Sequence, residues 1–445
     1  MTAALAGDRP TTTAIDLGGL GPSELRRLVE ILTVLTRHGA IVVARHGTTI
    51  AVRPRAGGGR ALAVALRRSF ADLGPAFMKL GQLVASSPGL FPPRLSEECR
   101  RLLDAAPPIP AAVVRATVAR ELGAPIEVLF DDFAIEPVAA ASIAQVHEAR
   151  LRDGRRVAVK IRRPRLRHRV ERDLRLLHQL ARAFERTGSL GRSANPVAII
   201  DDFATTLRAE LDLRLEATAM RTFAATLTGS PDRERIVIPS PVDELVTERV
   251  LVMDFVDGAP IDDVERHRHL DLEDILRVAV RVWLEGVLLH GCFHGDVHAG
   301  NLFVTTDGRV AFLDFGITGA VTPATRSTLA TLLPSVLVTR DFGAVVDSLF
   351  DLGAARGPID RDAAARDLDG LVTPLVGQAL GDIAFGEVLD QIVRVATRHR
   401  IRLPRELVLV VKQLLYFERY GKAIAPDHQI LSDPCLLYTS PSPRD

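Results

Sequence analysis

Residues 293–303 read Phe-His-Gly-Asp-Val-His-Ala-Gly-Asn-Leu-Phe, and they bear on the fold more than any other stretch of the chain. A long amphipathic helix, predicted at 272–290, precedes this stretch, and a short hairpin is predicted to follow it. The stretch contains Asp296 and, five residues later, Asn301. A carboxylate and an amide oxygen are hard ligands of the kind that Mg²⁺ takes. We therefore predict a loop that handles phosphate and magnesium here.

The predicted hairpin leads to Asp314-Phe315-Gly316. Protein kinases combine H-x-D-x-x-x-x-N with D-F-G: the first Asp orients or deprotonates the attacking hydroxyl, and the Asn and the second Asp hold Mg²⁺. D-F-G alone says little, because three residues recur by chance, but both motifs at this spacing favour a kinase-like cleft. The weaker interpretation makes Asp296 a turn residue and Asp314 a strand-end cap. We predict that Asp296 is catalytic, that Asn301 and Asp314 bind Mg²⁺, and that ATP/ADP is the nucleotide.

Two upstream segments fit the same cleft. Residues 157–160, Val-Ala-Val-Lys, read as a strand that ends in Lys160, whose ammonium can contact the α- and β-phosphates, although structural strands also end in lysine. Residues 251–258 fit the segment that joins two lobes. We expect Met253 beside the adenine, with the Asp254 carbonyl and the Val256 N–H bonding the adenine edge. A plain core strand that ends in a turn is the alternative for this segment.

The chain departs from an ordinary protein kinase in two places. Where a glycine-rich loop would cover the phosphates, the chain has Ala139-Ala140-Ala141-Ser142, and alanine cannot take the φ > 0 conformations of glycine. After Gly316 there is neither a long activation loop nor an A-P-E motif. We expect the alanine loop to bind nucleotide differently, and a protein substrate would lack its usual docking platform.

The order of predicted elements is a helical extension, a small β-rich lobe and a large helical lobe with helices and loops after Gly316. This order predicts an α+β, protein-kinase-like two-lobed fold with an N-terminal helical extension. Residues 57–59, Gly-Gly-Gly, are expected to form a linker. We expect a helical and flexible segment at 1–59, a helical extension at 60–125, an N-lobe with inserted helices at 126–256, a helical C-lobe at 257–434, and a non-native tail at 435–445.

Composition and charge narrow the functional classes. The chain has 445 residues and a net charge of +1, which gives no argument for a nucleic-acid partner. Basic residues concentrate between Lys160 and Arg186; we interpret them as a solvated helix face, with a surface for anionic lipid headgroups as the alternative. The three cysteines form no C-x-x-C pair, which favours a reducing compartment. With no secretory signal and no long apolar run, we expect a cytoplasmic protein, associated at most peripherally with the inner face of the plasma membrane.

Several blocks together resemble one family, the UbiB/ADCK (AarF-domain) atypical kinases, over about residues 60–432. Residues 79–82, Lys-Leu-Gly-Gln, are similar to the family's K-x-G-Q signature, and residues 139–142 to its alanine-rich loop. Residues 210–212, Glu-Leu-Asp, are similar to its E-x-D motif. The resemblance implies that the extension folds over the cleft. It also implies that the residues that cap or regulate the cleft are Lys79, Gln82, Glu210 and Asp212.

The acidic helix that follows the E-x-D motif has a predicted role of its own. Asp212 and Glu216 are four residues apart, so we expect them to share a helix face, to repel each other and to attract cations. Lys160 is the expected partner of one of them, and the resemblance assigns that role to Glu216. A solvated acidic stripe is the alternative.

The resemblance also implies a function. Members of this family support isoprenoid quinone (ubiquinone) biosynthesis and lipid homeostasis, act as ATPases or small-molecule kinases, and associate with membranes. We therefore expect an atypical kinase or ATPase with a small-molecule or lipid substrate such as a quinone precursor, and we leave a homodimer open. An ATP-gated lipid-binding chaperone or scaffold is the alternative, and a true protein kinase is the third. Bacterial members often carry C-terminal membrane helices, and we expect that the tail beginning at Cys435 replaces the natural C-terminus.

Overall fold

The structure is a computed structural model, and the chain divides into two compact units. Unit 1 comprises Met1–Pro107, Ala140–Ile143 and Arg163–Leu211, and unit 2 comprises Pro108–Ala139, Ala144–Arg162 and Asp212–Asp445. The predicted tail at 435–445 lies outside the described residues. The structure describes residues 21–46, 58–85, 91–102, 106–186, 195–335, 339–351, 360–375, 378, 381–382, 385–399, 401 and 405–427.

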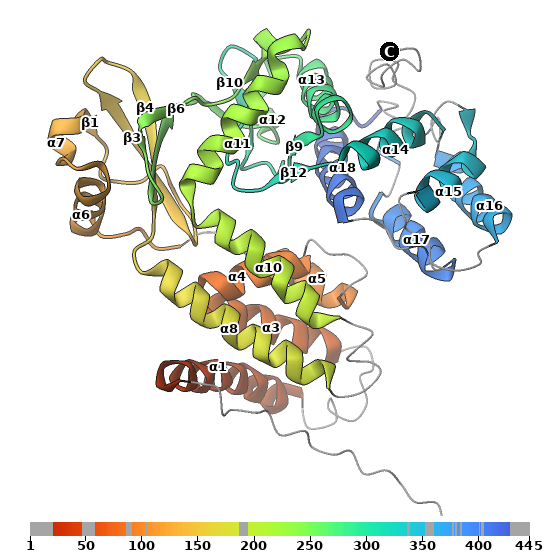
Figure 1. The fold of residues 1–445 in the computed structure, drawn as a ribbon, viewed down its shortest axis with the longest axis horizontal. Helices are drawn as coiled ribbons and strands as arrows, with labels where there is room; N and C mark the ends of the chain where they lie inside the picture. The colour runs from red at the N-terminus through yellow and green to blue at the C-terminus, as the bar shows by residue number, and fades with distance from the viewer. Residues whose placement is uncertain are drawn as a thin grey trace, which may run out of the picture. The chain divides into compact units, whose positions relative to one another are not determined.

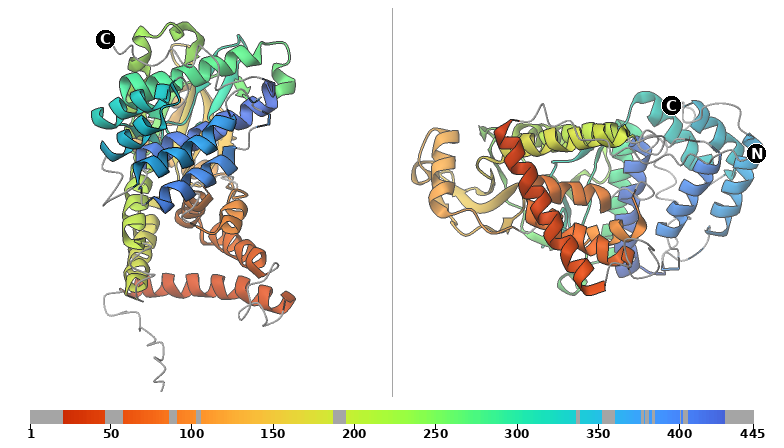
Figure 2. Two further views of the ribbon diagram at one scale, coloured as in Figure 1. Left: turned by 90° about the vertical axis from the view of Figure 1, so that its right-hand side faces the viewer. Right: turned by 90° about the horizontal axis from the view of Figure 1, so that it is seen from below.

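Unit 1 is built mainly from helices (Figure 1). Helices α8 and α10 pack side by side, α4 packs against both, and α1 lies across α3 and α8 (Figures 1 and 2). Arg27 of α1 is buried, and it binds Asp173 of α8 at 2.7 Å and the Leu73 carbonyl at 2.7 Å. A buried guanidinium needs such partners, so this contact fixes α1 to its neighbours. The helices are α1 (Pro22–His46), α3 (Gly58–Leu73), α4 (Pro75–Ala85), α5 (Pro93–Cys99), α8 (Leu166–Glu185) and α10 (Pro196–Glu210).

The predicted glycine linker is wrong at Gly58 and Gly59, which begin α3. Glycine costs a helix about 1 kcal/mol relative to alanine. The apolar face of α3 packs against α1, α4 and α5, and this packing outweighs the cost of two terminal glycines.

The first sheet has six strands: five form an antiparallel path in the order β1-β3-β4-β7-β6, and β2 pairs with β3 off this path. In β4 the alternate residues Val157, Val159 and Ile161 are buried in a core that includes α6. Side chains alternate across a strand, so Lys160 points to the opposite face of the sheet. The strands are β1 (Phe130–Phe133), β2 (Ala139–Ala140), β3 (Ala144–Leu151), β4 (Arg156–Arg162), β6 (Pro241–Val246) and β7 (Val250–Asp254).

A second part of unit 2 surrounds Trp283, which is fully buried in a core cluster with Phe293 and Phe417. Two small sheets accompany it, one in the order β5-β11-β10-β8 and one pairing β12 with β9. The helices of unit 2 as a whole, of which α6 and α7 pack on the first sheet, are α6 (Ala111–Leu122), α7 (Ile126–Leu129), α11 (Leu213–Thr226), α12 (Val264–His267), α13 (Leu272–Glu285), α14 (Pro323–Pro334), α15 (Phe342–Asp351), α16 (Arg361–Val372), α17 (Phe385–Arg398) and α18 (Arg405–Ile424). The strands are β5 (Ile236–Val237), β8 (Gly258–Pro260), β9 (Cys292–His294), β10 (Leu302–Thr305), β11 (Val310–Phe312) and β12 (Thr318–Ala320).

The predicted α+β class is confirmed, with two local differences. Strand β12 was not predicted, because only its pairing with β9 makes its three residues a strand. The division into units also differs from the predicted boundaries: α6 belongs to unit 2, and α8 and α10 belong to unit 1. Among the helices that the structure describes, none combines the length and the apolar character needed to cross a bilayer.

Candidate active site

Lys160 lies between two carboxylates in unit 2. Its Nζ is 2.7 Å from Glu216 Oε1, on α11, and 3.1 Å from Asp314 Oδ1, which follows β11. The Lys160 and Glu216 side chains are 11% and 4% exposed, whereas that of Asp314 is 49% exposed. Three segments far apart in the sequence thus bring one ammonium and two carboxylates together, with Asp314 open to solvent.

The charges in this cluster are not balanced. Burial raises the pKa of Glu216 to about 7, opposed by the Lys160 ammonium and assisted by Asp314. Burial alone would lower the pKa of Lys160, but the carboxylates of Asp314 and Glu216 outweigh it and hold that pKa above its usual value. A charged lysine therefore faces two acids that compete for it. Such a cluster gains from another cation near Asp314.

The backbone at Asp314 is in the left-handed region, with φ of 54°. Few residues other than glycine take this conformation, and Asp is among those that tolerate it. The Gly316 N–H donates to Asp314 Oδ1 at 3.2 Å, while the Phe315 ring packs against Phe223 at 5.4 Å and His294 at 4.8 Å. Because Phe315 is buried in the core, the reversed backbone turns the Asp314 carboxylate toward solvent and Lys160.

The loop that contains Asp296 is fixed to the loop that contains Asp314 by His294. Its Nε2–H donates to the Leu313 carbonyl at 2.8 Å, and its Nδ1 accepts from the Asp296 N–H at 3.2 Å. One ring nitrogen donates and the other accepts, which is the pattern of a neutral imidazole. Burial also lowers the pKa of His294, so the ring stays neutral.

Asn301 and Asp314 fit a magnesium ion. The Asn301 Nδ2 donates to the Asp296 carbonyl at 3.0 Å, so its Oδ1 is the end that can bind a cation. The Leu313 N–H donates to the Asn301 carbonyl at 2.8 Å, which makes Asn301 and Asp314 neighbours. No group of three His, Cys, Asp or Glu side chains suited to a metal occurs among the described residues. Mg²⁺ commonly takes one or two protein oxygens and completes its shell with waters and phosphates, and an amide oxygen and a carboxylate are donors of that type.

Three buried side chains that the sequence did not point out bond to the backbone of the Asp296 loop. Trp283 Nε1 donates to the His294 carbonyl at 2.9 Å. Gln413 bonds both the Gly295 carbonyl and the Val297 N–H, and the Tyr420 hydroxyl donates to the Val297 carbonyl at 2.8 Å. One signal was available: Gln413 and Tyr420 are seven residues apart, and that spacing puts both on one face of a helix.

The predicted adenine-binding segment, 251–258, begins within β7 and continues past its end at Asp254. Met253 pairs with Ala158 of β4, and Asp254 N–H donates to the Ser240 carbonyl at 3.0 Å. The Asp254 carbonyl belongs to the last residue of β7, and the Val256 N–H lies two residues beyond it. Their role in binding adenine stays a prediction.

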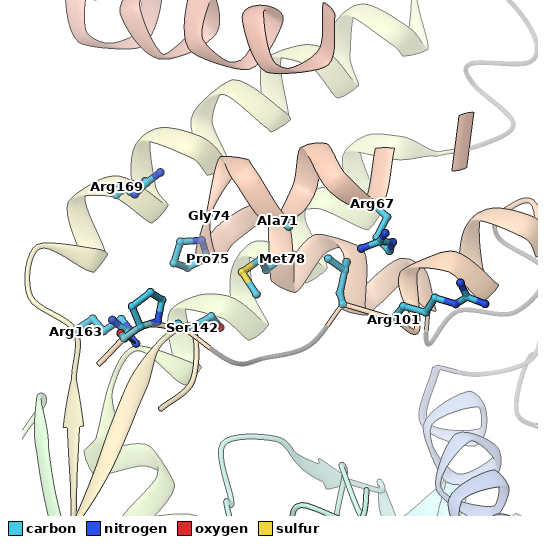
Figure 3. Close-up of a pocket in the computed structure, with 12 residues that line it drawn as sticks. Arg67, Ala71, Gly74, Pro75, Met78, Arg101, Ser142, Arg163 and Arg169 are labelled. Carbon is cyan, nitrogen blue, oxygen red and sulfur yellow. Dashed lines mark hydrogen bonds between the residues drawn. The ribbon is translucent and has the colours of Figure 1, made fainter. Parts of the chain in front are cut away.

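The alanine-rich loop is divided between the units: Ala139 belongs to unit 2, and Ala140, Ala141 and Ser142 belong to unit 1. In unit 1, Arg163 donates to the Ala141 carbonyl at 2.8 Å. Ser142 lines a cavity of about 520 Å³, together with Met78 and four arginines (Figure 3). The role of this loop toward phosphates stays a prediction. The four arginines are Arg67, Arg101, Arg163 and Arg169.

Within unit 1 the structure brings together Lys79 of α4 and Glu210 of α10, with Nζ 2.9 Å from Oε2. Gly81 allows α4 to approach its neighbours closely, because a Cβ there would lie 2.2 Å from Leu102 Cδ1. Gln82 is half-buried on the same helix. The capping or regulatory roles of these residues stay predictions.

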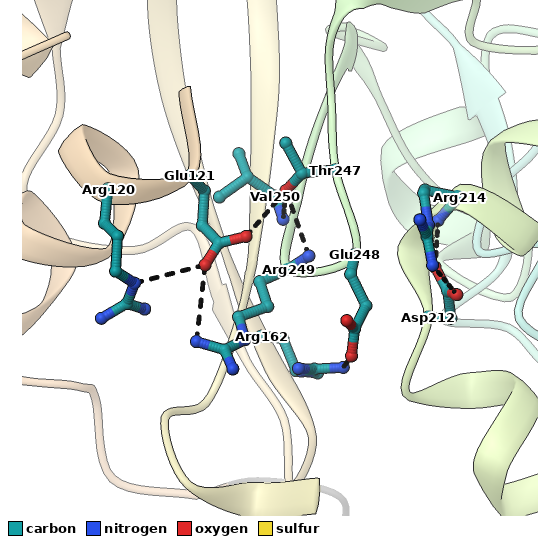
Figure 4. Close-up of polar contacts among 9 residues, drawn as sticks. All are labelled: Arg120, Glu121, Arg162, Asp212, Arg214, Thr247, Glu248, Arg249 and Val250. Atoms are coloured by element: carbon teal, nitrogen blue, oxygen red, sulfur yellow. Dashed lines mark hydrogen bonds and ion pairs between the residues drawn. The ribbon is translucent and has the colours of Figure 1, made fainter. Parts of the chain in front are cut away.

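Asp212 differs from the prediction that it shares a helix face with Glu216. It is the N-cap of α11, where it accepts from the Arg214 N–H at 3.1 Å and pairs with the Arg214 guanidinium at 2.7 Å (Figure 4). The hydrogen bond from Arg214 holds the pKa of Asp212 below its usual value. Asp212 therefore pairs with the Arg214 guanidinium. Of the two carboxylates, it is Glu216 that pairs with Lys160.

Comparisons with known proteins support the predicted kinase-like fold. The family model described as the ABC1 atypical kinase-like domain matches residues 101–349, and the UbiB helical domain model matches residues 368–429. An uncharacterized protein of Mycobacterium tuberculosis is 43% identical over 373 residues, which cover 83% of this chain and 76% of that protein. An uncharacterized aarF domain-containing protein kinase of Arabidopsis thaliana, named as chloroplastic, is 33% identical, covering 84% of this chain and 74% of the relative.

A bacterial kinase relative and a solved structure extend the comparison. The probable protein kinase UbiB of Aliivibrio fischeri is 31% identical, covering 91% of this chain and 77% of the relative. A Mycobacterium tuberculosis protein solved in complex with erythromycin superposes with a TM-score of 0.52 at 23% identity, covering 82% of this chain and 93% of that one. At this identity the solved structure supports the fold alone.

Proposed function

Because the chain belongs to the ABC1 (UbiB/AarF) family of atypical kinase-like proteins, as its motifs predicted, we propose that it binds Mg-ATP and transfers or hydrolyses the γ-phosphoryl group. The observation that carries the proposal is the position of Lys160 between Glu216 and Asp314. A lysine ordered by a helix glutamate, next to the Asp of D-F-G, is the arrangement that phosphoryl transfer requires.

Each residue of the cluster has a distinct part in this proposal. Lys160 binds phosphate oxygens, and Glu216 fixes the direction of the Lys160 ammonium. Asn301 Oδ1 and the Asp314 carboxylate would hold Mg²⁺, which when bound neutralises charge on the phosphates. Asp296 orients the attacking hydroxyl or water and accepts its proton.

The partial burial of the site supports the same proposal. Lys160 and Glu216 are shielded from water, whereas Asp314 is half exposed. Electrostatic contacts are stronger where water is excluded, so the ammonium is preorganised on the dry side of the cluster. Phosphate and metal can approach Asp314 from its exposed side.

The direct test is ATP turnover by the purified chain with Mg²⁺ and with EDTA. We expect turnover only with Mg²⁺, and loss of turnover in Lys160→Met. Equal ATP affinity in the wild-type chain and in Lys160→Met would refute nucleotide binding at this site.

We also propose an acceptor class. Relatives that bear the name probable protein kinase UbiB match most of this chain, and the family resemblance implies isoprenoid quinone metabolism. The acceptor would then be a small molecule or lipid, such as a quinone precursor, reached by peripheral association with a membrane. Turnover that rises when a phenolic quinone precursor in vesicles is added would support this class, whereas phosphorylation of proteins alone would contradict it.

A further inference from the structure

The three residues around the catalytic Asp have six backbone polar groups, and all six have partners. The Gly295 N–H donates to the Ile317 carbonyl at 3.0 Å. The Asp296 N–H and carbonyl bond the side chains of His294 and Asn301 at 3.2 Å and 3.0 Å. The other three groups, which are the Gly295 carbonyl and both groups of Val297, bond side chains of α18. Half of the loop's backbone bonds therefore come from one distant helix.

Gln413 supplies two of these bonds from a position that is 0% exposed. Its Nε2 donates to the Gly295 carbonyl at 2.6 Å, and its Oε1 accepts from the Val297 N–H at 2.9 Å. Only the nitrogen end of an amide can face a carbonyl, so the two partners fix the orientation of the amide. The Gln413 side chain therefore bonds both the residue before Asp296 and the residue after it.

Tyr420 supplies the third bond, from its hydroxyl to the Val297 carbonyl at 2.8 Å. Burial raises the pKa of this hydroxyl, which therefore remains a donor at any physiological pH. Between the two polar residues, Phe417 packs its ring against Trp283 with centroids 5.6 Å apart. The same face of α18 thus has an apolar anchor for the helix and two polar groups for the loop.

We propose that Gln413 and Tyr420 are positioning residues, which fix the Asp296 carboxylate relative to Asn301 and Asp314 through the backbone of residues 295–297. The inference rests on the proposed function of Asp296. The family model for the kinase-like domain ends at residue 349, and that for the helical domain covers residues 368–429. The helical domain would then complete the catalytic loop of the kinase-like domain.

Gln413 and Tyr420 do more than fill space in the core, because their polar groups hold the backbone of the loop. Removal of either polar group leaves a buried backbone N–H or carbonyl without its partner, and the loop must move to find another. A displacement of about 1 Å at a catalytic group can cost roughly 10²-fold in rate. The nucleotide is held by other residues, so its binding should change little.

The test compares Gln413→Met and Tyr420→Phe with Phe417→Leu, which weakens the same helix without removing a bond to the loop. In the first two variants we expect kcat for Mg-ATP turnover to fall roughly 10- to 100-fold per folded protein, with KM for ATP within about twofold of wild type. Phe417→Leu should lower the melting temperature and leave kcat within about twofold. Loss of kcat no greater than in Phe417→Leu would overturn the proposal.

A second readout does not depend on turnover. Amide hydrogen exchange of the loop peptide 293–301 should rise about tenfold in Gln413→Met, because the Val297 N–H loses its acceptor. Exchange in Gln413→Met as slow as in Phe417→Leu would overturn the proposal. This readout holds even if the wild-type chain turns over no ATP. Absence of turnover in the wild-type chain would instead refute the proposed function. Should Gln413→Met fail to fold, Tyr420→Phe, which removes one oxygen and leaves the acceptor of the Val297 N–H in place, decides the proposal through kcat.

Discussion

Among the described residues, two lysine–glutamate pairs that join separate elements of the fold have similar lengths but different surroundings. Lys160 lies 2.7 Å from Glu216 in unit 2, and Lys79 lies 2.9 Å from Glu210 in unit 1. Lys160 also lies 3.1 Å from Asp314, whose carboxylate is half exposed, whereas the Lys79 and Glu210 side chains are 18% and 12% exposed. An ion pair with an additional, solvent-facing carboxylate is suited to receive a cation and phosphates. An ion pair between two helices is suited to hold those helices together.

The largest expected effect is a loss of turnover when Asp314, the additional carboxylate, is replaced. Asp314→Asn keeps the shape of the side chain and removes the charge that would bind Mg²⁺, so we expect kcat for Mg-ATP turnover to fall about 10²- to 10³-fold or more. Steady-state kinetics measure this loss. Asp307→Asn is the matched control, because Asp307 lies exposed in the turn of the same hairpin. An equal loss in both variants would show that the hairpin, not the charge, matters.

The second prediction concerns stability. Lys160→Met leaves the buried Glu216 without the Lys160 ammonium, so the unfolding free energy should fall by about 3 kcal/mol. Lys79→Met should cost less, about 1 kcal/mol, since that pair is nearer to water. Urea denaturation of the two variants measures the difference. If Lys79→Met were the more destabilising change, the comparison between the pairs would be reversed.

The third prediction is a pH dependence. The pKa of Glu216 is about 7 in the folded protein, above its ordinary value of 4.5, because burial disfavours the charged form. A raised carboxyl pKa contributes stability that is complete below about pH 4.5 and is lost as pH rises toward 7. In the wild-type chain, this titration should lower the unfolding free energy by roughly 2–3 kcal/mol between pH 4.5 and pH 7. Glu216→Gln should remove that part of the pH dependence.

Urea denaturation at pH 5 and pH 7.5 tests this sign. Other groups titrate in the same range, so the quantity to compare is the wild-type slope minus the Glu216→Gln slope. Parallel profiles would mean that Glu216 does not carry the effect. A steeper decline in the variant would contradict the direction of the shift.

The smallest expected effect concerns the pair in unit 1. A double-mutant cycle with Lys79→Met and Glu210→Gln should give a coupling energy of about 1 kcal/mol, as expected for a partly buried pair. Thermal denaturation of the two single variants and the double variant measures it. A coupling near zero would mean that the contact adds nothing to the association of α4 with α10.

Local sequence was sufficient for much of the site and part of the fold. Asp296, Asn301 and Asp314 lie within one loop–hairpin segment, so their spacing in sequence reports their proximity in space. The α6 helix ends at Gly123 with φ of 76°, as glycine after a helix predicts. Lys160 was identified as the last residue of an alternating strand predicted at 157–160, and β4 continues two residues further, to Arg162.

Longer-range features could not be predicted in the same way. Gln413 and Tyr420 bond to a loop more than a hundred residues earlier in the chain, and nothing in their own segment names that partner. The pattern at 196–227 is continuously helical, and only the bond from the Arg214 N–H reveals that Asp212 begins a new helix. Strand β12 exists through its pairing with β9. In each case the contact, not the local propensity, decides the structure.

Calorimetric titration of ATP tests the central claim most directly, which is that the Lys160 cluster is a Mg-ATP site. The account predicts that the wild-type chain binds ATP more tightly with Mg²⁺ than with EDTA and that Asp314→Asn removes this difference, while Asp307→Asn retains it. ATP binding that is equally tight with Mg²⁺ and with EDTA, in both the wild-type chain and Asp314→Asn, would contradict it.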